Sequence, residues 1–142
     1  MARVELELPD RWDFTTELPV RIQDLNYGGH VGHDKLLGYT HEARAQLFAS
    51  QGWSELDVAG GIGIAIVDTA AVYAREVKYG MSLLVEVAVT ALRSRGCELY
   101  YRITDRASGT EMVRAKTGIV FFDYRTGKVG HMPEVFRAAF QR

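Results

Sequence analysis

The spacing of apolar residues changes twice along the chain. From Pro19 to Gln23 apolar and polar residues alternate, which predicts a short strand. From about His33 to Ser50 apolar residues recur at intervals of three and four, which predicts a helix with one apolar stripe that Gly52 ends. Segments rich in Val, Ile, Tyr and Phe then predict strands over residues 62–79, 83–92, 97–104 and 110–124, and a closing helical turn over residues 133–141.

The connections between the later strands are short and rich in glycine, so we expect antiparallel hairpins. The order of elements predicts an α+β fold in which one antiparallel sheet covers one apolar helix. Arg44 falls within the apolar stripe and needs an acidic partner, for which Asp24 is the favoured candidate. Four polar residues interrupt the second strand, where they either line a pocket or form an exposed face: Asp68, Tyr73, Arg75 and Glu76.

Composition narrows the choice of partners. The chain has 142 residues, three prolines and no repeat, which predicts a single domain over residues 1–142. Its net charge is -1, which argues against nucleic acid as a partner. The single cysteine, Cys97, cannot form an intramolecular disulfide, and we expect it to be a small core residue. The sequence shows neither the apolar run of a signal peptide nor a bilayer span, so we expect a soluble cytoplasmic protein without a membrane partner.

The turn between the first strand and the helix concentrates polar residues and glycines. The first N–H groups of a helix are unpaired and carry partial positive charge, so they can polarise a carbonyl and stabilise an oxyanion. Gly28, Gly29 and Gly32 would let a flat substrate approach the backbone. We expect His33, at the start of the apolar stripe, to face inward as a general base or a ligand for water.

The stretch from Arg21 to Arg44, with its aspartate turn, paired glycines, His-Val and Glu-Ala-Arg, resembles the 4-hydroxybenzoyl-CoA thioesterase family of hotdog proteins. It is also similar to the acyl-acyl carrier protein thioesterases. The resemblance implies a hotdog fold, in which a sheet of about five antiparallel strands wraps one long helix. It further implies edge-to-edge homodimers or homotetramers with active sites at subunit interfaces, and hydrolysis of acyl-CoA or acyl carrier protein thioesters. No metal or redox cofactor is implied, because coenzyme A belongs to the substrate.

The turn departs from the family pattern at one position. Well-understood members carry Asp-x-Asp, whose second aspartate is the nucleophile or base; here Asp24 matches the first and Asn26 the second. An amide cannot take a proton from water. We favour Asn26 holding water or the carbonyl while His33, which matches a histidine of Tol-Pal-associated members, takes the proton. Alternatively, Asp34 supplies the carboxylate, or the protein binds thioesters without hydrolysing them.

Other interpretations stay open. Asn26 also suits a purely structural turn role. A hotdog enoyl-thioester hydratase would carry Asp-x-Asn-x-x-His, and here His30, a further catalytic candidate, arrives one residue late. The histidines and Asp34 could hold a metal, but His33 falls on another side, so no metal is expected. Arg93 and Arg95 match, in position and charge, basic residues that bind the substrate's phosphates in related thioesterases.

Overall fold

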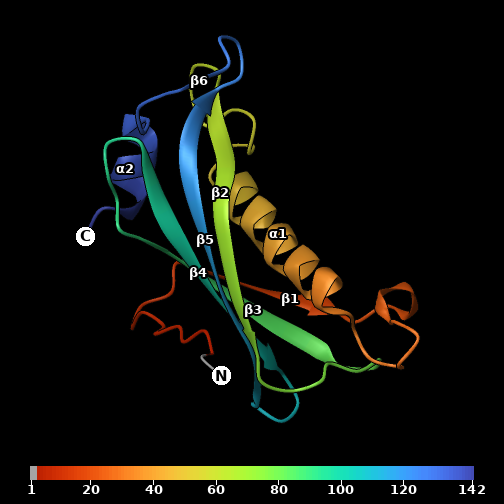
Figure 1. Ribbon diagram of the computed structural model, residues 1–142. Helices are drawn as coiled ribbons and strands as arrows, with labels where there is room; N and C mark the ends of the chain where they lie inside the picture. Colours follow the sequence, from red (N-terminus) through yellow and green to blue (C-terminus); the bar gives the residue numbers. More distant parts are fainter. Residues whose placement is uncertain (1–2) are drawn as a thin grey trace.

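One helix and one antiparallel sheet make up most of the computed structural model, which describes residues 3–142 (Figure 1). The predicted domain also includes Met1 and Ala2, which lie outside the described residues. The elements follow in the order β1 (Phe14–Pro19), a 3₁₀ turn (Ile22–Asp24), α1 (His33–Ser50), β2 (Ile62–Tyr73), β3 (Ser82–Thr90), β4 (Gly96–Asp105), β5 (Glu111–Asp123), β6 (Lys128–Val129) and α2 (Glu134–Phe140).

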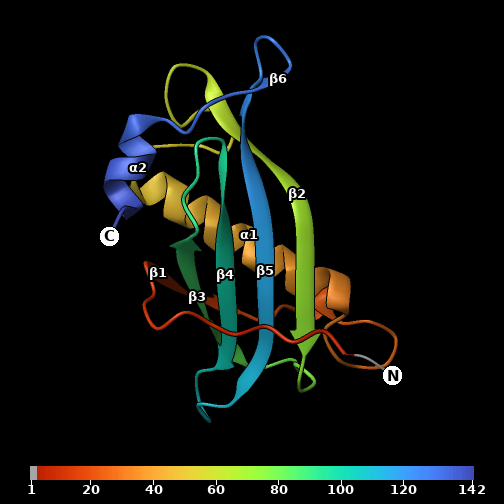
Figure 2. The same cartoon turned by 60° about the vertical axis from the view of Figure 1, so that its left-hand side comes forward.

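Within residues 3–142 the strands form a single antiparallel sheet in the order β1-β3-β4-β5-β2, with β6 added to β5. The sheet curves around α1, which crosses one face (Figure 2). The sequence of β4 shows why one face of the sheet packs on the helix. Every second residue from Cys97 to Asp105 is buried, and successive side chains of a strand point to opposite faces. The predicted α+β fold, one long helix covered by an antiparallel sheet, is confirmed.

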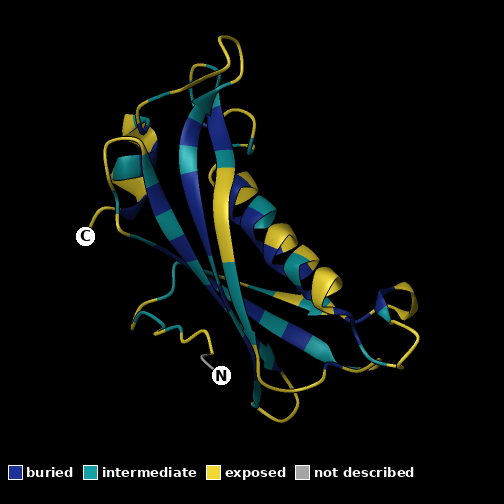
Figure 3. Ribbon diagram, viewed as in Figure 1, coloured by how far each residue is buried: buried dark blue, intermediate teal, exposed yellow. Residues whose placement is uncertain are grey.

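The core lies between α1 and the concave face of the sheet (Figure 3). The apolar stripe of α1 is buried there, and Cys97 is buried with it as predicted. Burial, and then the charge of neighbouring Glu98, raises the pKa of the Cys97 thiol to about 12, so the thiol is a packed apolar group rather than a nucleophile.

The C-terminal end of α1 is capped by backbone hydrogen bonds around Gly52, which adopts a positive φ. Gly52 has a φ of 82°, its N–H donates to the Ala49 carbonyl, and the Trp53 N–H donates to the Phe48 carbonyl. The rings of Phe48 and Trp53 pack edge to face 5.9 Å apart, and Phe136 of α2 covers both. The helix boundaries predicted from sequence are confirmed.

The first strand was wrongly placed by the sequence pattern. The strand is β1, Phe14–Pro19, which pairs with β3, whereas Ile22–Asp24 form a 3₁₀ turn. Alternation over five residues reports amphipathic character but cannot show which segment has a partner strand. The predicted strand over residues 62–79 also ends early, at Tyr73.

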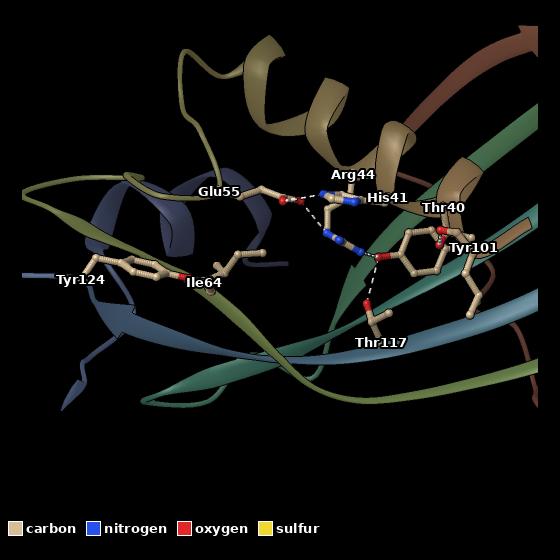
Figure 4. A network of polar contacts seen from close by, with 9 residues as sticks. Thr40, His41, Arg44, Glu55, Ile64, Tyr101, Thr117 and Tyr124 are labelled. Atoms are coloured by element: carbon tan, nitrogen blue, oxygen red, sulfur yellow. Dashed lines mark hydrogen bonds and ion pairs between the residues drawn. The ribbon is translucent and has the colours of Figure 1, made fainter. Parts of the chain in front are cut away.

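The acidic partner predicted for Arg44 was also wrong. The guanidinium is buried and its Nε lies 2.6 Å from Oε1 of Glu55, in the loop after α1 (Figure 4). Its Nη1 donates to the Tyr101 hydroxyl at 3.0 Å, and that hydroxyl also contacts Thr117 Oγ1 at 2.8 Å. The network joins α1 to the middle of β4 and β5.

Candidate active site

A cavity of about 340 Å³ opens where α1 begins. It lies between the turn that precedes α1 and the loop that follows β2. Its apolar wall consists of Val31, Leu36, Ala74 and Val77. Its polar lining consists of Asn26, His30, His33, Tyr73, Arg75 and Glu76.

The turn that forms one wall is closed by its own backbone. The Asn26 N–H donates to the His30 carbonyl at 2.9 Å, and the Gly29 N–H donates to the Asn26 carbonyl at 3.1 Å. Gly29 has a φ of 81°, which favours glycine. The Val31 N–H then donates to the Val77 carbonyl at 2.8 Å. These bonds hold Asn26 and His30 against the loop after β2.

The side chain of Asn26 is oriented by that same turn. Its Oδ1 accepts a hydrogen bond from the Gly28 N–H at 2.9 Å. Only the oxygen can accept there, so the NH₂ group is on the other side of the amide. Nδ2 lies 3.9 Å from the position that a Cβ on Gly32 would occupy, next to the start of α1. Asn26 therefore has a structural role in the turn and still presents two donors at the cavity.

Several backbone N–H groups at the N-terminus of α1 have no hydrogen-bond acceptor among residues 3–142. Gly32, the N-cap, is buried and has no side chain to cap the helix. The Leu36 N–H donates to the Gly32 carbonyl at 3.1 Å, whereas the N–H groups of His33, Asp34 and Lys35 have no acceptor within residues 3–142. Such a helix end can stabilise negative charge on a carbonyl oxygen.

The two histidines occupy different positions at the cavity. We expected His33 to face inward, but its side chain is exposed and packs edge to face with the Tyr73 ring at 6.3 Å. His30 is partly buried, with Nδ1 3.3 Å from the Val31 carbonyl oxygen and Nε2 3.9 Å from Oε1 of Glu76. Asp34 is exposed on the first turn of α1 and does not line the cavity.

Tyr73 keeps its proton at this site. Burial, and then the charge of Asp34, raises the pKa of the hydroxyl, which donates to the His33 carbonyl at 3.4 Å. Tyr73, Arg75 and Glu76 come from the end of β2 and the loop after it. Their only sequence signal was that polar residues interrupt an apolar strand, which did not distinguish a pocket from an exposed face.

Several predicted site residues lie outside the cavity. Gly28 and Gly29 are exposed on the turn. Arg93 and Arg95 lie in the loop between β3 and β4, beside α2, where Arg137 donates to the Arg93 carbonyl (Figure 1). This is the opposite end of α1, a helix of 18 residues and therefore about 27 Å long. Within one chain these arginines are not brought together with the turn.

Asp24 is buried behind the turn and does not line the cavity. Its carboxylate accepts hydrogen bonds from the Tyr39 hydroxyl and the Arg21 N–H. Burial alone would raise the pKa of Asp24, but these hydrogen bonds and the Arg21 charge outweigh burial and lower it. Asp24 therefore ties the 3₁₀ turn to α1 and to the backbone of Arg21, just after β1.

We expect part of the acid sensitivity of the fold to come from Asp24. A lowered pKa stabilises the folded state above the ordinary carboxyl pKa, and this contribution is lost as pH falls through the lowered value. The free energy of unfolding of Asp24→Asn should thus fall less than that of the wild type between about pH 5 and pH 2. Urea denaturation at several pH values across this range measures the free energy of unfolding. Asp10→Asn, at an exposed aspartate, is the control. Equal pH slopes for wild type and Asp24→Asn would contradict the assignment.

Within residues 3–142, no group of three or more His, Cys, Asp or Glu side chains is arranged to hold a metal ion. No helix in the same range is long and apolar enough to cross a bilayer.

This chain is similar to known thioesterases both in sequence and in structure. The family model of the thioesterase-like superfamily matches residues 20–140. A search of the curated proteins finds no match to the chain. Slr0204, a 1,4-dihydroxy-2-naphthoyl-CoA thioesterase from Synechocystis, is similar in structure, with a TM-score of 0.81, 23% identity, and coverage of 89% of this chain and 93% of that one.

Two further solved structures share the fold. The PA2801 protein of Pseudomonas aeruginosa has a TM-score of 0.83 and 22% identity, covering 91% of this chain and 98% of that one. BH1999, a gentisyl-coenzyme A thioesterase, has a TM-score of 0.78 and 16% identity, covering 89% of this chain and 98% of that one. The predicted hotdog fold is confirmed by these likenesses.

Proposed function

Since the chain belongs to the thioesterase-like superfamily, and is therefore a thioester hydrolase, we propose that the cavity at the start of α1 is its active site. This membership confirms the resemblance seen in the sequence. The observation that carries the proposal is that Asn26, with its NH₂ group, and His33, whose backbone N–H is unpaired at the start of α1, line the same cavity.

The proposed substrate is an acyl thioester of coenzyme A or of an acyl carrier protein. Its carbonyl oxygen accepts hydrogen bonds from Asn26 and from the backbone N–H groups near His33. Water attacks the carbonyl carbon, a C–O bond forms, and the oxyanion is stabilised by these donors. The C–S bond then breaks, and the thiolate takes up the proton that the water released. The chemistry uses no metal or redox cofactor.

The apolar wall of the cavity would receive the acyl group. Val31, Leu36 and Val77 are buried, and the Tyr73 ring stands beside them. Two of the similar structures are thioesterases for aromatic acyl groups, naphthoyl and gentisyl. We therefore include an aromatic thioester among the first substrates to be tested.

The edge of the sheet supports the proposal of a homodimer or homotetramer. Within residues 3–142, β2 pairs with β5 on one side only, and its middle is exposed (Figure 3). Ile66 and Val67 are large apolar residues exposed there. Pairing of two β2 edges would place Tyr73 and the cavity near the subunit interface. In such an assembly Arg93 and Arg95 would bind substrate phosphates held by another subunit.

The proposal is tested by measuring thiol release from acetyl-CoA, palmitoyl-CoA, isobutyryl-CoA and benzoyl-CoA. We expect at least one to be hydrolysed with turnover saturable in substrate. Incubation with crotonyl-CoA distinguishes a thioesterase from an enoyl-thioester hydratase, because a 3-hydroxy product without free thiol would identify a hydratase. Tight binding of all these thioesters with no thiol release would identify a binding protein and refute hydrolysis.

A further inference from the structure

The cavity contains a carboxylate, although Asn26 stands where related thioesterases carry aspartate. Among the polar residues that line it, the only carboxylate is that of Glu76, in the loop after β2. The loop is held against the turn by the hydrogen bond from the Val31 N–H to the Val77 carbonyl at 2.8 Å. Glu76 is thus next to a residue that is fixed to the turn. Asp34, the carboxylate that the sequence suggested as a substitute, does not line the cavity.

The backbone around His30 determines which ring nitrogen can accept a proton. Nδ1 lies 3.3 Å from the Val31 carbonyl oxygen, and a carbonyl can only accept, so the hydrogen of the neutral ring belongs on Nδ1. This tautomer leaves a lone pair on Nε2, which is the nitrogen closest to Glu76. The arrangement matches a base oriented by a hydrogen bond on its other ring nitrogen.

The distance between His30 and Glu76 is suited to a water molecule. Nε2 and Oε1 are 3.9 Å apart, too long for a direct hydrogen bond but short enough for one water to bridge. A water between two acceptors donates both of its hydrogens. Its oxygen lone pairs are then free to point at a carbonyl carbon, which is the orientation that attack requires.

We propose that Glu76 and His30 together hold the attacking water, and that Glu76 supplies the catalytic carboxylate that Asn26 does not provide. The inference rests on the proposed thioester hydrolysis and identifies its base. As the C–O bond forms, one water proton passes to Nε2 of His30 while Glu76 accepts the hydrogen bond from the other. When the C–S bond breaks, the proton on Nε2 passes to the thiolate, and the ring returns to its starting form.

His33 is less suited to this role. Its ring is exposed and packs on Tyr73, and within residues 3–142 it makes no ion pair with a carboxylate. A base needs a partner that keeps the correct nitrogen unprotonated and aimed at the water. His30 has such a partner in the Val31 carbonyl, and Glu76 lies 3.9 Å from its other ring nitrogen.

The test compares Glu76→Gln, His30→Gln and the double variant on the panel thioester that the wild type hydrolyses fastest. We expect each single substitution to lower kcat by about 10²-fold. The double variant should be little worse than either single variant, because groups that act as a unit are not additive. Glu76 is exposed, so its substitution should leave Tm unchanged. Glu134→Gln, an exposed glutamate at the start of α2, is the matched control.

A binding measurement separates chemistry from substrate placement. The probe is the ketone analogue of that thioester, in which a methylene separates sulfur and carbonyl (phenacyl-CoA for benzoyl-CoA). Its Kd should be the same for wild type, Glu76→Gln and His30→Gln. A kcat of Glu76→Gln equal to that of wild type would overturn this inference while leaving thioester hydrolysis intact.

Two other results would also overturn it. Loss of activity in Glu76→Gln that is fully explained by a weaker Kd for the ketone would make Glu76 a binding residue. A fall in kcat confined to His33→Ala would assign the base to His33. Absence of thiol release by the wild-type protein would instead refute the proposed function, and this inference with it.

Discussion

Replacing Asn26 with alanine is expected to lower kcat by about 10²- to 10³-fold, the usual cost of losing one oxyanion donor. The reason is the orientation of the amide. Oδ1 is engaged by the Gly28 N–H, so the NH₂ group is the part that can contact a substrate oxygen. Thiol release under saturating substrate measures the effect. Tyr27→Ala is the control for disturbance of the turn, because that side chain is fully exposed, and it should stay within about twofold of wild type.

Asn26→Asp distinguishes two roles for this position. Aspartate can still accept the Gly28 N–H, so the turn should persist, but its second oxygen replaces the donor by an acceptor. We therefore expect a loss of activity similar to that of alanine. An increase in kcat would show that a carboxylate at this position works as nucleophile or base, and that asparagine is not the donor proposed here.

Glu55→Ala is expected to lower the free energy of unfolding by about 3 kcal/mol, because it leaves the buried Arg44 guanidinium without its carboxylate. The Tyr101 hydroxyl would remain the only side-chain hydrogen-bond partner of Arg44 among residues 3–142. Breaking a buried ion pair by removing one partner is costly, since the other charge stays away from water. Urea denaturation monitored by tryptophan fluorescence measures the change.

Glu111→Ala is the matched control for that stability measurement. Glu111 also pairs with an arginine, Arg114, at 2.7 Å, but both side chains are more exposed than those of Arg44 and Glu55. Its removal should cost at most about 1 kcal/mol. Equal losses for Glu55→Ala and Glu111→Ala would mean that burial adds nothing to the Arg44 pair.

Much of the fold could be predicted because its information is local. The helix boundaries followed from a 3.6-residue period ended by Gly52, whose positive φ suits glycine. The later strands followed from long β-branched and aromatic segments between glycine turns, and their predicted bounds lie close to those observed for β3, β4 and β5. The first strand failed because five alternating residues carry too little information to exclude a turn that follows Pro19.

The residues of the candidate site likewise fall into a group that is close together in the sequence and a group that comes from a distant segment. Asn26, His30 and His33 share one short turn and helix start, so the sequence alone could bring them to one place. Glu76 and Tyr73 are more than 40 residues away from Asn26 along the chain and reach the cavity through pairing of β2 with β5 and the Val31–Val77 hydrogen bond. No local period records such a pairing.

Local chemistry thus decided which segments become helix and strand, and where a helix start rich in donors would lie, because backbone preferences and capping act over a few residues. The three-dimensional packing decided which charges meet. It gave Arg44 the carboxylate of Glu55, gave Asp24 the hydroxyl of Tyr39, and placed Glu76 opposite His30. The first two pairs form where a loop or turn beside α1 folds back onto the helix, and the third forms where the loop after β2 meets the turn, so no local period in the sequence records them.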